Sequence, residues 1–83
     1  MILGTITILT TDRQANSRDL NQILTDAGHL IMARLGVNVQ KSCLEHCTGL
    51  ISLAVEGDED KIKALLEKLN TVVGIKAELT IMA

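Results

Sequence analysis

The sequence contains no Phe, Tyr or Trp, so its core must be built from Ile, Leu, Val, Met and Ala. The length of 83 residues predicts a single domain, residues 1–83. A core of this size is marginal unless it packs well or is shared with a second copy, so we expect self-association. The missing rings also remove the stacking platforms on which single-strand and RNA-binding proteins hold bases.

Positive charge is scarce as well. There are 8 Lys and Arg against 10 Asp and Glu, which gives a net charge of −2, and the basic residues form no cluster. Attraction to the phosphate backbone is therefore missing. We expect no direct binding of nucleic acid by this chain.

Signals for secretion and for membranes are absent from the sequence. Residues 1–9 carry no basic leader and are interrupted by Gly and Thr, and no apolar run approaches the roughly 20 residues that span a bilayer. Two cysteines, Cys43 and Cys47, are too few for a secreted disulfide framework. The sequence thus predicts a cytoplasmic protein without membrane attachment, whose cysteines are thiols unless they hold a metal.

The clearest strand is residues 48–57, where Ile51, Leu53 and Val55 alternate with smaller or polar residues. This period of two is typical of a strand with one buried face. Similar alternation predicts strands over residues 2–10, 30–39 and 73–82, with Gly36 at a bulge in the second. Helical spacing of apolar residues predicts helices over residues 13–27 and 58–71.

The ends of these helices carry recognisable signals. Thr11 or Asp12 is placed to cap the first helix, and Gly28 is placed to end it in a left-handed conformation. The run of residues 58–60, Asp-Glu-Asp, puts negative charge on the first turn of the second helix, where the helix dipole favours it. Glu59 and Lys63 fall together on its outer face.

The order strand, helix, strand, strand, helix, strand predicts an α+β, ferredoxin-like fold. Its four-stranded antiparallel sheet carries two helices on one face, with the first and third strands in the centre. The other sheet face remains uncovered and partly apolar, which makes it a natural association surface. We expect this face to present Thr5, Thr7, Met32, Arg34, Ser52, Ala54, Lys76 and Glu78.

Two groups of residues are candidate binding sites. Thr10, Thr11, Asp12 and Arg13 join a central strand to a helix, where free amides and the helix dipole could receive an anionic ligand; ordinary helix capping is the alternative. Arg34 is expected to project from the uncovered sheet face, solvated or paired with a carboxylate.

The second group is the cluster Cys43, His46 and Cys47. Two thiolates and an imidazole suit zinc, nickel or another transition metal, although a fourth ligand is needed. His29 begins the second strand and so lies about 30 Å away along an extended chain, within reach only from another subunit. Free thiols on a hairpin connection are the alternative, with no cofactor. No Ser/His/Asp or Cys/His pair has a supporting third group, so we expect no enzyme activity.

The residues also resemble a known family, through Asp12 and Arg13, residues 21–24, residues 34–36, residues 49–55, Lys68 and Leu69, and residues 73–75. These motifs, in this order and spacing over almost the whole chain, are similar to those of the iron-only hydrogenase system regulators, ACT-like ferredoxin-type domains. More remotely, the chain resembles the C-terminal sensing domain of nickel-responsive regulators.

The resemblance implies a dimeric or tetrameric ACT-like regulator that senses a small ligand and is not an enzyme. Two departures from the pattern stand out. The Pro-Gly pair that follows the acidic residue in amino-acid-binding ACT domains is replaced by Arg13 and Gln14, and no ribbon-helix-helix segment is present. Regulation would then pass through a separate partner protein. The alternative function is a transition-metal sensor or carrier that uses the Cys/His cluster.

Overall fold

The computed structural model describes residues 1–38 and 47–83. Their elements follow the predicted order of strand, helix, strand, strand, helix and strand, with one added turn of 3-10 helix. They are β1 (Ile2–Thr10), α1 (Arg13–Asp26), η1 (Gly28–Leu30), β2 (Ile31–Asn38), β3 (Gly49–Gly57), α2 (Glu59–Asn70) and β4 (Ile75–Ile81). Every predicted strand and helix among these residues is present, with ends that differ by no more than two residues from those expected.

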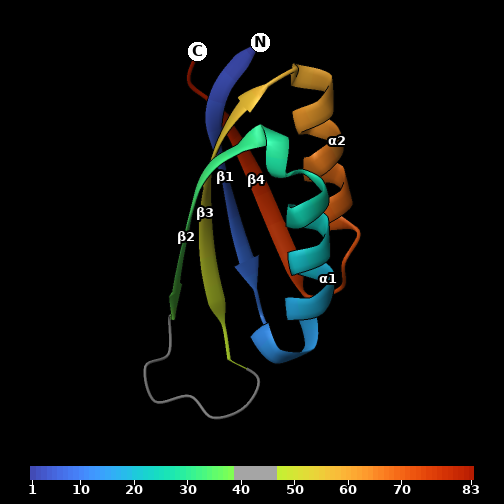
Figure 1. Cartoon of the computed structure of the whole chain (residues 1–83). Coiled ribbons are helices and arrows are strands. Elements are labelled where there is room, and N and C mark those ends of the chain that lie inside the picture. The colour runs from blue at the N-terminus through green and yellow to red at the C-terminus, as the bar shows by residue number, and fades with distance from the viewer. Residues whose placement is uncertain (39–46) are drawn as a thin grey trace.

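The four strands form one antiparallel sheet in the order β2-β3-β1-β4. Both helices lie on the same side of this sheet, and none of the described residues forms a helix on the opposite side (Figure 1). The predicted ferredoxin-like fold is therefore confirmed, with β1 and β3 in the centre and β2 and β4 at the edges.

The core lies between the sheet and the two helices. It is made of the strand residues that face the helices and of one apolar stripe from each helix, because alternate residues of a strand point to the same side. Its most deeply buried aliphatic side chains are Ile6, Ile8, Leu53, Val55, Ile62 and Leu69. Burial of aliphatic residues alone thus forms the core that the sequence predicted.

Side-chain caps fix the start of each helix. Asp12 accepts a hydrogen bond from the Ala15 amide at 3.1 Å, and Asp58 accepts from the amides of Asp60 and Lys61 at 2.8 and 3.2 Å. These bonds satisfy amides that have no partner inside the helix.

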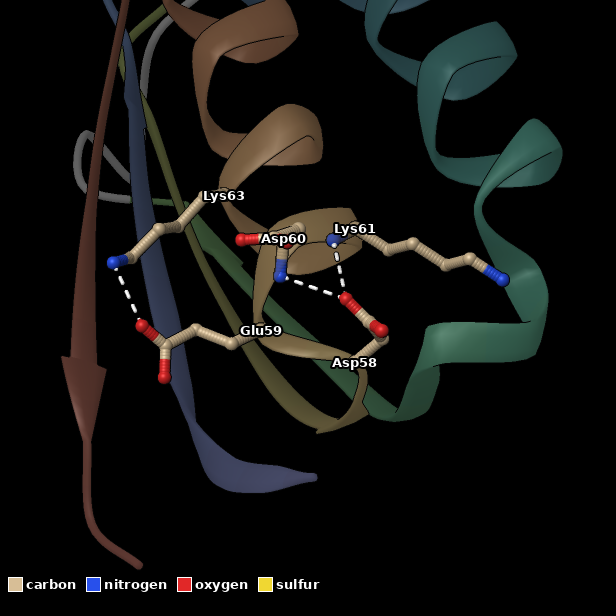
Figure 2. A network of polar contacts seen from close by, with 5 residues as sticks. All are labelled: Asp58, Glu59, Asp60, Lys61 and Lys63. Atoms are coloured by element: carbon tan, nitrogen blue, oxygen red, sulfur yellow. Dashed lines mark hydrogen bonds and ion pairs between the residues drawn. The ribbon is translucent and has the colours of Figure 1, made fainter.

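The start of α2 also carries an ion pair on its outer face. Lys63 lies 2.7 Å from the carboxylate of Glu59, one turn earlier (Figure 2). The hydrogen bond and the charge of Glu59 raise the pKa of Lys63 above its ordinary value. The acidic first turn and the Glu59–Lys63 pair are both as predicted.

The end of α1 differs from the prediction at Gly28. The Ala27 amide donates to the Ile23 carbonyl, and the chain then continues directly into η1. Among the described residues, the glycines with positive φ are Gly57 and Gly74, so Gly28 does not end the helix in a left-handed conformation. A second tight turn replaces that ending because Leu30, at the end of η1, enters the core.

The register of β2 corrects the prediction for Arg34. The pairing with β3 shifts between Ile31 and Ala33, which marks a bulge four residues before the predicted site at Gly36. Beyond the shift, Arg34 lies opposite the buried Leu53, so it points to the helix side of the sheet. One extra residue reverses the facing of every later side chain in a strand, because the side-chain period is two.

The same shift turns Ala33, Leu35 and Val37 onto the uncovered sheet face. They lie opposite Ala54, Ser52 and Leu50, respectively. The uncovered face is therefore more apolar along β2 than the plain alternation predicted.

No helix in residues 1–38 and 47–83 has the length and apolar character needed to cross a bilayer.

Candidate functional site

A cavity of about 340 Å³ lies between α1 and the adjoining ends of β2 and β3. We call it the arginine pocket. Its polar and open walls come from Arg13, Ser17 and Asn21 of α1, Arg34 and Gly36 of β2, and Gly49 of β3. The cavity exists where β2, an edge strand, runs beside α1, and its volume falls at the lower end of the range for small-molecule sites.

Helical periodicity brings the α1 residues to one wall. Arg13, Ser17 and Asn21 are separated by four residues each, and this spacing places side chains one above another along a helix. Leu20, on the same side of the helix, is buried and forms part of the cavity floor. The spacing is visible in the sequence, but it indicates a binding wall only once the strand opposite α1 is known.

Arg34 reaches the pocket from the opposite wall. Its Nη2 donates a hydrogen bond to Oδ1 of Asn21 at 3.1 Å, which ties the edge strand to α1. The bulge near Met32 gives Arg34 this position, whereas plain alternation would have left it on the uncovered face. Arg34 was singled out from the sequence, but it was expected on the wrong side of the sheet.

The side chain of Arg13 packs against the backbone of Gly49. A Cβ atom on Gly49 would come within 2.6 Å of the Arg13 Cδ and 2.7 Å of its Cγ, so the stem of Arg13 lies directly over the Gly49 backbone. The Arg13 amide also donates to the Cys47 carbonyl at 2.7 Å. A residue larger than glycine at position 49 would displace the arginine.

The four residues predicted to receive a ligand have different surroundings. Thr10 and Arg13 both line the arginine pocket, whereas Thr11 and Asp12 are not among its lining residues. Asp12 caps α1, and the Thr11 hydroxyl lies 3.3 Å from the Gly74 carbonyl oxygen. The capping alternative thus holds for Asp12, and ligand binding at this group stays a prediction.

Asn16 is a buried polar residue for which no pattern in the sequence predicted a role. Its Oδ1 accepts from the Thr10 hydroxyl at 2.9 Å, and its Nδ2 donates to the Val73 carbonyl at 2.8 Å. These bonds connect the end of β1, the start of α1 and the turn before β4. Asn16 therefore holds in place the β1–α1 junction from which Arg13 projects.

The predicted metal cluster lies only partly within the described residues. Cys43 and His46 fall outside them, so the three-residue site remains a prediction. Cys47 is buried and disulfide-bonded, which differs from the thiol we expected. A disulfide sulfur offers no thiolate to a metal, so Cys47 would have to be reduced before it could act as a ligand.

Two hydrogen bonds join Gln14 to Cys47. The Gln14 Nε2 donates to the Cys47 sulfur at 3.8 Å, and the Gln14 Oε1 accepts from the Cys47 amide at 3.1 Å. His29 is exposed within η1. Across residues 1–38 and 47–83, no three His, Cys, Asp or Glu side chains come close enough together to hold a metal ion.

The uncovered sheet face carries an apolar row at its end nearest the pocket. Val37, Leu50 and Leu9 lie side by side on β2, β3 and β1, and Lys76 of β4 completes the row. All three apolar side chains are more than a third exposed. We call Val37, Leu50 and Leu9 the sheet-face row; two of its members, Val37 and Leu50, also line the arginine pocket.

The fold and its topology place the chain among the ferredoxin-like α+β domains. Within this class the chain belongs to the TM1266-like family, described as "Iron-only hydrogenase system regulator, putative", whose model matches residues 2–78. The family resemblance seen in the sequence is thus confirmed.

One solved structure supports the same relationship. The chain is similar to the uncharacterized protein TM1266 from Thermotoga maritima, with 27% identity and a TM-score of 0.86 over 99% of this chain and 98% of that one. No curated protein matches the chain significantly.

Proposed function

We propose that the chain is a non-enzymatic regulatory domain that assembles with copies of itself and senses a small ligand in the arginine pocket. The observation that carries this proposal is the sharing of Val37 and Leu50 between that pocket and the sheet-face row. The family description, which names a regulator of the iron-only hydrogenase system, supports the regulatory role. The regulated target would be reached through a separate partner protein in the cytoplasm.

The uncovered sheet face has the size and the chemistry for docking a second copy. Four neighbouring strands of 7 to 9 residues present a sheet face of roughly 500 Å². Two copies would together bury about 1,000 Å², which is the lower bound for a specific interface. The sheet-face row supplies an apolar centre, and Lys76 and Glu78, paired at 3.6 Å, lie on the β4 side of the face.

Ligand binding and assembly would be coupled through the shared residues. A ligand changes the population of an assembled state only when it binds that state with a different affinity from the unassembled one. Val37 and Leu50 border the pocket on the helix side of the sheet, while their side chains lie on the opposite face, at the proposed interface. A shift of these strand residues is therefore the means by which the pocket would influence docking.

A single charge in the sheet-face row should abolish the assembly. We expect Leu50→Glu to sediment as a monomer at concentrations where the unchanged chain is a dimer or larger, because two carboxylates would meet in an apolar interface. Leu50 is 37% exposed in the single chain, so the substitution leaves the core intact. Sedimentation velocity over a range of concentrations measures the effect.

The matched control is Val73→Glu. Val73 is 91% exposed and lies in the turn before β4, away from the sheet face, so this variant should assemble like the unchanged chain. Equal masses for the Leu50→Glu variant and the unchanged chain, or a monomeric unchanged chain at high concentration, would refute assembly through this face.

Sensing of a ligand is tested by a thermal-shift screen of amino acids, nucleotides and metal ions, read beside the sedimentation mass. A ligand at about 100 times its Kd stabilises the folded state by about 2.7 kcal/mol, which corresponds to a rise in Tm of about 10–20 °C for a domain of this size. We expect at least one compound to raise the Tm and to change the assembled mass. A screen in which no compound does both contradicts the sensing role.

A further inference from the structure

We propose that the ligand of the arginine pocket is a small organic anion, held through a carboxylate or phosphate group by Arg34 and Arg13. This inference rests on the proposed function and names the chemical class of its effector. Three features of the pocket support it: its charge, the way in which Arg34 is held, and the shape of its floor.

The pocket concentrates positive charge in a chain that is acidic as a whole. The net charge of the chain is −2, yet two of its three arginines, Arg13 and Arg34, line this one cavity. None of the described residues that line it is acidic. Two guanidinium groups beside a partly enclosed cavity attract an anion more strongly than the same groups would in open solvent.

Arg34 is positioned but not neutralised by the bond that holds it. Its partner Asn21 is a neutral amide, and the bond uses one of the five N–H donors of the guanidinium. The planar fork matches the two oxygens of a carboxylate or a phosphate. The bond to Asn21 also reduces the conformational entropy that Arg34 would lose on binding such a group.

The remaining walls suit the body of a small molecule. Gly36 leaves open space on the β2 side, since a Cβ placed there would have only Ile51 nearby, at 3.8 Å. Leu20 and Ile51 provide an apolar floor, while Ser17 offers a hydroxyl at the side. A cavity of about 340 Å³ accommodates a short carbon chain with one or two anionic groups and excludes a macromolecule.

The nearest acidic residue along the chain, Asp12, does not line the pocket. It is engaged as the cap of the helix, with its Oδ1 accepting from the Ala15 amide. The positive end of the α1 dipole lies at the same end of the helix as Arg13 and adds to the attraction for an anion.

The test uses the full chain and three probes: succinate, inorganic phosphate and the neutral diamide succinamide. Binding is followed by the ¹⁵N–¹H NMR shifts of the Ser17, Gly36 and Gly49 amides. We expect saturable shifts with succinate or phosphate that weaken at high salt, and none with succinamide. A response to succinate alone identifies a carboxylate ligand, and a response to phosphate alone identifies a phosphate ligand.

Variants matched in charge assign the binding to Arg34. Arg34→Gln should weaken binding about 10- to 100-fold, the effect of losing a charge-assisted pair of hydrogen bonds. Arg18→Gln removes the same charge from an exposed position on α1 outside the pocket and should leave the affinity within about twofold. Arg34→Lys, which keeps the charge but loses the fork, should bind with intermediate affinity.

Three outcomes would overturn the inference: no binding of either anion, equal binding of succinamide, or equal weakening by Arg34→Gln and Arg18→Gln. Sedimentation of the same samples separates this inference from the proposed function. Anion binding that leaves the assembled mass unchanged would support the inference and contradict sensing. A neutral compound that changes the assembled mass equally in the unchanged chain and in the Arg34→Gln variant would support sensing and contradict the inference.

Discussion

Truncation of Leu53 to alanine is expected to lower the free energy of unfolding by about 2–5 kcal/mol, which for a domain of this size lowers the Tm by roughly 10–40 °C. Leu53 is 0% exposed and lies on β3, in the centre of the sheet, within the aliphatic core cluster. The chain has no aromatic side chain that could move into the cavity left behind. Small domains have total stabilities of about 5–15 kcal/mol, so the loss is a large share of the whole.

The unfolding of this chain is best followed by far-UV circular dichroism, because it has no Trp or Tyr whose fluorescence could report it. Val73→Ala is the control: an apolar side chain is shortened in the turn before β4, away from the sheet face, where it is 91% exposed. Its cost should be within about 0.5 kcal/mol. Similar urea midpoints for the two variants would mean that the layer under the helices is not the core.

Replacement of Gly4 by alanine is expected to cost about 1–3 kcal/mol or more, although alanine is usually the better residue within a strand. A Cβ on Gly4 would overlap the Thr80 carbonyl oxygen and lie 3.2 Å from the Ile81 Cα. Both of these atoms belong to the backbone of β4, so no side-chain rotation can relieve the overlap. The edge strand would have to move away from β1.

Gly36→Ala is the control for Gly4. Its Cβ would meet only the Ile51 side chain, at the ordinary distance of 3.8 Å, and we expect it to be neutral or to stabilise by up to about 1 kcal/mol. Urea midpoints give the difference between the two variants. Faster hydrogen exchange at the Met82 amide, which donates to the Leu3 carbonyl at 2.8 Å, would locate the damage at β4. Equal midpoints would contradict the close approach of β4 to Gly4.

Most of the fold could be predicted because hydrophobic periodicity reports it directly. The alternation around Leu53 identified a central strand, and the acidic run before Ile62 located the start of α2. Both signals depend only on neighbours in the sequence. The end of α1 could not be predicted in the same way, because Leu30 turns the chain through contacts with distant parts of the core.

The candidate site was predicted only in part, for a related reason. Thr10 and Arg13 could be singled out because Thr10 ends a strand and Arg13 begins a helix, which are local signals. Arg34 was assigned to the wrong face because a bulge leaves no periodic trace: residues 30–39 alternate equally well without it. The hydrogen bond between Arg34 and Asn21 joins β2 to α1, and no local pattern in the sequence predicts that these two elements are in contact.

The extra residue in β2 has a consequence for how the chain is compared with its relatives. In a strand of the same length paired without the irregularity, Leu35 would face α1 and the guanidinium of Arg34 would leave the pocket. A strand one residue shorter between Ile31 and Arg34 would bring that guanidinium to the pocket with regular pairing. The number of residues that separates Ile31 from an arginine, taken together with the presence of the bulge, therefore predicts whether a relative keeps the cationic wall, and percentage identity does not.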